Sequence, residues 1–343
     1  MNTFKSFLIL ICLGMASGAH AQTAEEALHH LEDITSSLDE FRVNTWNVLK
    51  SMAHNNSTAE LEWQIQSLAD KVEVERKRVS AAEGFYGDLS AKVAMTVFLR
   101  NSHSILTDDF KAIRRLEAKS GESFEKMESY LVAQNLANER LSEAGERFDD
   151  EIKRFAERYK LEVTDHKSAL SESIEKASQA LGYYNQVFLS YFKVYHQKLA
   201  VYEALKSEDL EIIAEEIELF EYYAQEGSQR LLILGGFMED ESLSVAAVNI
   251  LRQFRHEAET VFPAAQRAIE RKQIFNLAQE VFDKIPEKEV SDNDIDHLNS
   301  LIDPLNKAIE MQNQEFSRSE SKRQQLFDAW NKEIAAFFNK YLS

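Results

Sequence analysis

The stretch "VAMTVFLR" at residues 93–100 decides the fold, because it reads as a segment of buried helix and recurs later in the chain. A near copy, "VAAVNILR", occupies residues 245–252, 152 positions further on, and Phe110 and Phe262 stand at the same separation. Both stretches are apolar on every side of a helix, whereas an outer helix needs only one apolar stripe. We therefore predict that each is the innermost helix of a repeated helical unit.

A second pair of matching segments follows in the same order. "FDDEIKRFAERY" at 148–159 matches "WNKEIAAFFNKY" at 330–341, including Ile152 with Ile334 and Tyr159 with Tyr341, at a separation of 182 residues. The second unit therefore carries 30 additional residues (182 − 152) between its matching segments. We place these residues around 270–303.

Elsewhere, apolar residues recur every three or four positions nearly throughout, as in amphipathic helices. Only 10 glycines and 3 prolines interrupt a chain rich in helix-forming residues. We predict an all-α protein of two tandem four-helix bundle-like units with long antiparallel, coiled-coil-like helices, over residues 22–162 and 163–343. Pro263 should bend one long helix, and Asp303-Pro304 should open the last one.

The N-terminus predicts export. Lys5 precedes the apolar run "SFLILICLGMASG" and the small-residue site "AHA" at 19–21, which is the pattern of a signal peptide cleaved after Ala21. The run is too short for a lasting transmembrane anchor. The single cysteine, Cys12, lies inside it, so thiolate chemistry and disulfides are excluded from residues 22–343. We predict a periplasmic, cell-surface or extracellular location.

The charge balance argues against two classes of partner. The formal net charge of −19 repels phosphate backbones and anionic lipid. The basic clusters "RKR" at 76–78 and "RR" at 114–115 are too short to reverse this repulsion. We therefore predict no nucleic-acid binding, and a membrane-associated coat would need a basic amphipathic face that the sequence lacks.

Motifs for catalysis are weak. Glu26-x-x-His29 and Asp294-x-x-His297 have the spacing of di-metal helical bundles, but both lie in polar contexts at the ends of helical regions. There is no Gly-x-Ser-x-Gly motif and no glycine-rich phosphate loop. We predict no enzymatic activity, no catalytic or metal-binding residues and no cofactor, and keep a carboxylate/His metal-dependent enzyme as the alternative.

An aromatic stripe is the most distinctive feature for binding. Tyrosine joins apolar area to a hydroxyl group, which suits a helix–helix seam and an open binding groove equally well. Both interpretations stand, as do a buried helix end and an apolar contact patch for "LLILGGFM" at 231–238. The predicted residues for binding a protein or peptide partner through an aromatic or apolar groove are Tyr184, Tyr191, Phe192 and Tyr195.

The C-terminal part resembles a known family. The segments "DESLSVAAVNILRQF" (240–254), "DIDHLNSLID" (294–303) and "NQEF" (313–316) are similar to those of an uncharacterised family of exported all-helical bacterial surface or periplasmic proteins. The resemblance lies mainly over 240–343 and implies an all-α envelope protein without known activity. The expected function is thus an exported non-catalytic helical scaffold or binding protein of the bacterial envelope.

Overall fold

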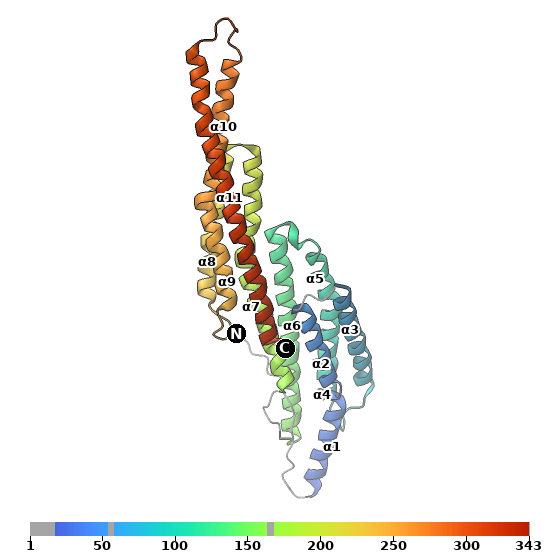
Figure 1. Ribbon diagram of the computed structural model, residues 1–343. Helices are drawn as coiled ribbons and strands as arrows, with labels where there is room; N and C mark the ends of the chain where they lie inside the picture. The colour runs from blue at the N-terminus through green and yellow to red at the C-terminus, as the bar shows by residue number, and fades with distance from the viewer. Residues whose placement is uncertain (1–17, 54–57, 163–167, 343) are drawn as a thin grey trace. The chain divides into compact units, whose positions relative to one another are not determined.

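The computed structural model describes residues 18–53, 58–162 and 168–342, and over these residues the chain is helical, with no named strand (Figure 1). The predicted all-α class is confirmed. Residues 1–17 of the predicted signal peptide lie outside the described residues. None of the described helices combines the length and apolar character needed to cross a bilayer.

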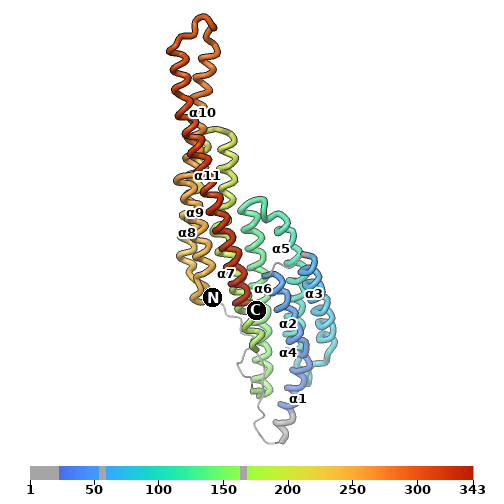
Figure 2. Tube along the Cα trace, viewed as in Figure 1, coloured from blue at the N-terminus to red at the C-terminus, as the bar shows by residue number. Residues whose placement is uncertain are grey.

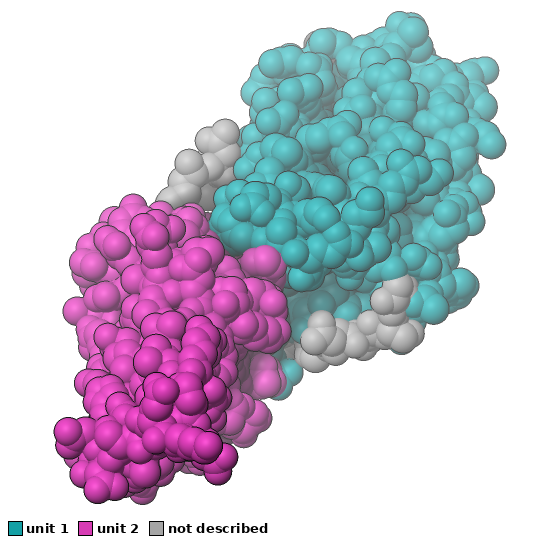
Figure 3. Space-filling model, turned by 90° about the horizontal axis from the view of Figure 1, so that it is seen from above, with its two compact units in different colours: residues 1–183, 338–343 teal, residues 184–337 magenta. Residues whose placement is uncertain are grey.

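The chain divides into two compact units (Figure 3). Unit 1 comprises residues 1–183 and 338–343, and unit 2 comprises residues 184–337. The division falls inside α7 (Ala169–Ser207), whereas the sequence places a boundary at 162/163, between α6 and α7.

In unit 1, helix α4 occupies the centre. It packs against α1, α3 and α6, while α2 packs on α3 and α5 on α6. Its buried face belongs to a core that includes Leu31, Val79, Leu99 and Phe155. The elements of unit 1 before α7 are α1 (Gly18–Thr35), α2 (Leu38–Ala53), α3 (Thr58–Ala81), α4 (Ser90–Ser104), the π-helix η1 (Ile105–Asp109), α5 (Phe110–Glu117), the 3-10 turn η2 (Ser120–Glu122) and α6 (Phe124–Arg158).

Unit 2 repeats this order after α7. Helix α8 packs against α9 and α10, and the rings of Phe220, Phe254 and Phe262 form its buried centre. Asp209 caps α8 by accepting hydrogen bonds from the backbone N–H groups of Glu211 and Ile212. The remaining elements are α8 (Leu210–Leu234), α9 (Ser242–His256), the π-helix η3 (Glu257–Val261), α10 (Phe262–Phe282) and α11 (Asp292–Tyr341).

The first repeat spacing corresponds to equivalent geometry. A Gly-Phe-x-x-Asp turn precedes both α4 and α9, with paired backbone bridges Phe85–Asp88 and Phe237–Asp240. In both turns the residue after the phenylalanine, Tyr86 or Met238, has φ of 48°. The π-helices η1 and η3 then begin 152 residues apart, at Ile105 and Glu257. A π turn is rare enough that its recurrence at the same place is a strong match.

The second spacing is matched as well. Phe85 and Phe155 make an edge contact in unit 1 at 6.0 Å between ring centroids, and Phe237 and Phe337 make one in unit 2 at 5.7 Å. The additional residues of unit 2 form the end of the α10–α11 hairpin, which extends beyond the turn between α7 and α8 (Figure 2). In unit 1, α5 and α6 are joined by residues 118–123 alone.

Two local expectations are wrong. Val93 and Val245 are 51% and 50% exposed, so α4 and α9 are not covered on every side. Helix α4 packs mainly on α3 and α6, and α9 packs on α8, and each leaves one strip to solvent. Pro304 lies inside α11 rather than at a helix start. Its ring is on an exposed face, where the missing N–H is less costly than in a core.

Candidate functional site

The predicted aromatic residues line a seam between α7 and α11 of unit 2. Tyr184 stacks on Trp330 at 6.2 Å between centroids, and Tyr191 meets the same indole edge-on at 5.0 Å. Phe192 lies beside Tyr195, whose ring contacts Phe327 at 6.2 Å. Tyr191 is 6% exposed and Tyr195 is 42% exposed. The inner part of the stripe is therefore covered by α11, while its Tyr195 edge faces solvent.

The inner tyrosines remain neutral at physiological pH. Burial raises the pKa of Tyr184 to about 12 and the pKa of Tyr191 well above its ordinary value of 10.0. A phenol with a raised pKa stays protonated, because a buried phenolate would lose its hydration. These two groups therefore contribute packing area and a neutral hydroxyl.

A second feature of unit 2 is a buried ion cluster at the start of η3. Glu257 is 1% exposed, and its Oε2 lies 2.7 Å from Lys198 Nζ. Its Oε1 accepts hydrogen bonds from Ser319 Oγ at 2.6 Å and from Arg323 Nη1 at 3.0 Å. Gln253 Nε2 donates to Ser319 Oγ at 3.1 Å. The cluster thus connects α7, α9, η3 and α11 around one carboxylate.

Lys198 is the least satisfied member of the ion cluster. Its ammonium group has three N–H donors, yet among the described residues it meets no polar atom besides the Glu257 carboxylate. The rings of Phe254 and Tyr202 lie 5.4 Å and 5.6 Å from Nζ and supply weak cation–π attraction. Burial accordingly lowers the pKa of Lys198 from 10.5 to about 8, although the neighbouring Glu257 raises it.

The equivalent place in unit 1 is apolar. By the two repeat spacings, Glu257 corresponds to Ile105, while Ser319 and Arg323 correspond to Ala137 and Leu141. Ile105, Ala137 and Leu141 belong to one hydrophobic cluster under η1. Sequence reasoning missed the ion cluster, but one signal was present, since Glu257 stands where the matching position of unit 1 carries the apolar Ile105.

We expect the stability of the protein to rise between pH 8 and pH 10 through Lys198. The unfolded chain holds this proton up to its ordinary pKa of 10.5, whereas the folded chain releases it near pH 8. Raising the pH from 8 to 10 therefore increases the free energy of unfolding by about 2 kcal/mol, because the folded chain no longer buries a charged ammonium group. Above pH 10 Tyr184 acts in the opposite direction, because its phenol ionises first in the unfolded chain.

Urea unfolding at pH 8, 9 and 10 measures this effect. The variant Lys198→Met should show a flatter profile than the parent protein below pH 10. Equal slopes for the two proteins would contradict the assignment to Lys198.

The third feature is the break between α1 and α2 in unit 1. Thr35, Ser36 and Ser37 stand in a row, and the hydroxyls of the first two donate to carbonyls of the preceding turn, Leu31 O and Asp33 O. Such side-chain bonds compete with helix continuation. The corresponding place in unit 2 lies within α7, which runs unbroken for 39 residues.

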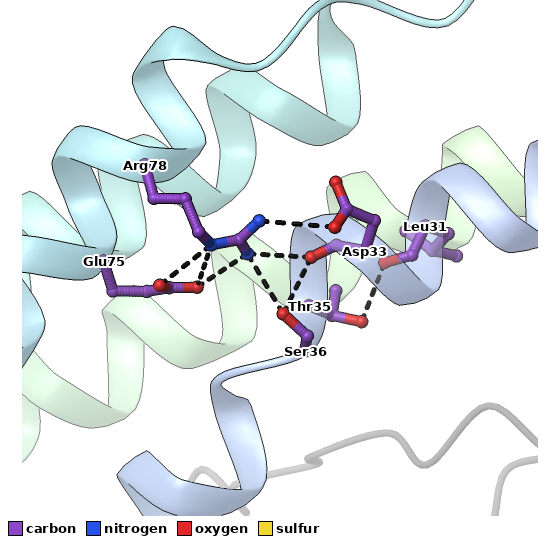
Figure 4. A network of polar contacts seen from close by, with 6 residues as sticks. All are labelled: Leu31, Asp33, Thr35, Ser36, Glu75 and Arg78. Atoms are coloured by element: carbon purple, nitrogen blue, oxygen red, sulfur yellow. Dashed lines mark hydrogen bonds and ion pairs between the residues drawn. The ribbon is translucent and has the colours of Figure 1, made fainter.

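Arg78 of α3 holds the break in place (Figure 4). Its Nη2 donates to Asp33 O at 2.8 Å and to Ser36 Oγ at 3.1 Å. Glu75, one turn earlier on α3, accepts from the same nitrogen at 2.7 Å, and this hydrogen bond lowers the pKa of the Glu75 carboxyl. A guanidinium is suited to this role because its planar fork can satisfy several oxygens at once.

Crevices border α2 on both sides. The α2–α3 groove, of about 320 Å³, has an apolar floor of Phe41, Leu68, Val72 and Leu99. Charged residues form its rim, and they are Glu40, Asp70, Lys71 and Glu75. Lys71 and Glu40 make an exposed ion pair of 2.8 Å across the two helices.

The α2–α6 crevice, of about 230 Å³, lies on the other side of α2. Apolar side chains of α1, α2 and α6 line it, together with Glu32, Asp39, Arg42 and Asp149. Arg42 Nη1 donates to Asp39 Oδ1 at 2.8 Å. Both spaces thus combine apolar walls with a charged, mainly acidic edge, which is a typical composition for a binding site.

The residues of the alternative metal-site interpretation lie apart from these features. Glu26 accepts a hydrogen bond from the Tyr86 hydroxyl, and Asp294 accepts from Ser291 next to the start of α11. His29 and His297 are exposed. In the described part of the chain, no three His, Cys, Asp or Glu side chains are grouped so as to hold a metal ion.

The chain matches no protein-family model, no curated protein and no solved structure. The family resemblance over residues 240–343 therefore stays a prediction.

Proposed function

We propose that this chain is an exported, non-catalytic binding protein of the bacterial envelope, built from two tandem copies of one four-helix unit. In this proposal the first copy carries the ligand-binding groove along α2. The observation that carries it is the pair of apolar-walled crevices on both sides of α2. Export rests on the N-terminal pattern, and duplication rests on the two residue spacings with their recurring turns and ring pairs.

A difference between unit 1 and unit 2 favours the groove along α2 as the binding site. In unit 2 the aromatic stripe of α7 is packed against Trp330 and Phe327 of α11, so most of its apolar area is already used. In unit 1, apolar side chains of α2, α3 and α4 line an open groove beside α2. Exposed concave apolar surface with polar edges is where ligands or partner side chains gain the most from leaving water.

The rim charges indicate the ligand. At the edge of the α2–α3 groove Lys71 pairs with Glu40 and Arg78 pairs with Glu75, which leaves Asp70 as the excess negative charge. A ligand that places an apolar group on the floor and neutral or positive groups at the rim meets no charge repulsion there. The ligand class that fits is therefore an apolar chain or side chain without an anionic head.

We expect the variant Asn44→Trp to block this groove. Asn44 lines the groove from α2, so an indole at this position would occupy the space over the apolar floor. Binding of the neutral apolar dye Nile red, measured by its fluorescence, should weaken about tenfold, because displacing one buried apolar group costs on the order of 1.4 kcal/mol or more.

The matched control is Asn47→Trp, which adds the same side chain at an exposed position on the same helix. It should bind the dye as the parent protein does. If both variants weakened dye binding equally, or if neither weakened it, the α2–α3 groove would not be the binding site.

A further inference from the structure

The α10–α11 hairpin carries an arm that the repeated unit does not need. At its base, Gln273 Nε2 donates to Glu208 O at 2.6 Å, and Lys272 pairs with the Glu208 carboxylate at 2.5 Å. On the other helix, Phe316 lies 6.5 Å from Tyr202 between ring centroids. Residues 274–315 form the arm, which extends past these contacts (Figure 1). Unit 1 has the matching helices without the 30 additional residues, which make up most of the arm, so those residues add nothing to the shared core.

The arm has more apolar rows than a hairpin requires. One row on each helix is partly buried, with Phe275 and Phe282 on α10 and Leu298 and Leu305 on α11. A second row is exposed to between 37% and 64%, and it consists of Ile274, Leu277 and Val281 on α10 and Ile295, Ile302 and Ile309 on α11. We call the three isoleucines on α11 the isoleucine row.

The isoleucine row has the period of a helix-packing seam. Ile295, Ile302 and Ile309 are spaced seven residues apart, which keeps them on one side of a helix. Isolated exposed apolar residues are common on protein surfaces, but a regular row of β-branched residues is typical of contact with another helix. More than a third of each isoleucine is exposed, so the row offers apolar area to a further helix.

The charge of the arm indicates which helix binds. Residues 274–315 contain ten Asp and Glu and three Lys, giving a net charge of 3 − 10 = −7. Asp296, Asp303 and Glu310 follow the isoleucine row at the same seven-residue spacing, one position further along the helix. A second copy of the arm would bring another −7, and an anionic membrane would be repelled in the same way. A helix with basic residues beside its apolar face is attracted.

We propose that the isoleucine row of α11 binds a cationic amphipathic helix of a partner protein. Apolar residues of the partner helix pack on Ile295, Ile302 and Ile309. Its Lys and Arg side chains lie against Asp296, Asp303 and Glu310. This interaction is independent of the α2–α3 groove, since it involves only unit 2.

The test uses the full chain and two synthetic helical peptides as probes. Both peptides carry Leu at three-four spacing, and the other positions are Lys in one and Glu in the other. Fluorescence anisotropy should show binding of the Leu/Lys peptide, weakened about tenfold or more by the double substitution Ile302→Gln with Ile309→Gln. Both substitutions are at exposed positions and leave the net charge unchanged. An unaltered circular dichroism spectrum would establish that the variant is folded.

The matched control is Leu232→Gln with Ile233→Gln, which removes two apolar side chains that are 83% and 87% exposed elsewhere on unit 2. It should bind the Leu/Lys peptide as the parent protein does. Asp296→Asn with Asp303→Asn should weaken binding and reduce its salt dependence.

Three results would overturn the proposal. The first is equal weakening by the two Gln double variants, which would assign binding to non-specific apolar contact. The second is equally tight binding of the Leu/Glu peptide. The third is sedimentation of the parent protein as a dimer that the Ile302→Gln, Ile309→Gln variant dissociates, since this would make a second copy the occupant of the row.

Discussion

Replacing Glu257 with glutamine is expected to lower the free energy of unfolding by about 3–5 kcal/mol, which is typical of removing one member of a buried ion pair. The carboxylate is shared by Lys198 and Arg323, whose side chains are 4% and 17% exposed. Without its negative charge these two cations would face each other in a poorly hydrated space. Urea unfolding at pH 7 measures the change.

A combined variant provides the matched control for Glu257. Glu257→Ile, Ser319→Ala and Arg323→Leu reproduce the residues of unit 1, and Lys198→Met removes the remaining charge. Buried ion clusters can often be replaced by apolar residues without loss of stability. The four substitutions together should therefore recover most of what Glu257→Gln loses. If the combined variant were as unstable as the single one, the repeat alignment at η1 and η3 would be wrong.

The substitution Gly227→Val is expected to cost about 3 kcal/mol or more, since added atoms in a packed contact displace backbone. A Cβ at position 227 would lie 2.4 Å from the backbone oxygen of Ser190 and 3.2 Å from Leu251 Cδ1. This glycine therefore sets how closely α8 approaches α7. Thermal unfolding followed by circular dichroism would report the loss.

Gly182→Val is the matched control on a helix. A Cβ at Gly182 would meet nothing within 4 Å. Valine is a slightly better helix former than glycine, so stability should change by no more than about 0.5 kcal/mol. A comparable loss at both positions would mean that the α7–α8 approach is looser than described.

The helical class and the two repeat spacings could be predicted from sequence, because apolar periodicity and paired aromatics are local patterns. The 152-residue spacing corresponds to matching turns and π-helices, and the range of about 270–303 predicted for the 30 additional residues overlaps the arm at 274–315. These features depend on residue types along one helix. They can be recognised without knowing which residues they contact in the folded structure.

Features that depend on neighbours could not be predicted in the same way. Val93 is apolar and lies among apolar residues, yet it faces solvent because α4 packs mainly on α3 and α6. Pro304 carries a helix-start pattern, but α11 continues through it. Lys198 and Glu257 look like surface residues until α7, η3 and α11 are brought together. The openings beside α2 likewise depend on how α1, α3, α4 and α6 are placed around it, which the sequence alone does not determine.

The two π-helices also bear on the history of the chain. A π turn arises when a single residue is inserted into an α-helix, and η1 and η3 occupy corresponding positions. Proline did not create them, since Lys111 stands in unit 1 where Pro263 stands in unit 2. If the units are copies, the inserted residue was present in their common ancestor, and the divergence between Ile105 and Glu257 came afterwards. In that case the backbone hydrogen bonding of the π-helices is the older feature, and the buried ion cluster of unit 2 is the more recent one.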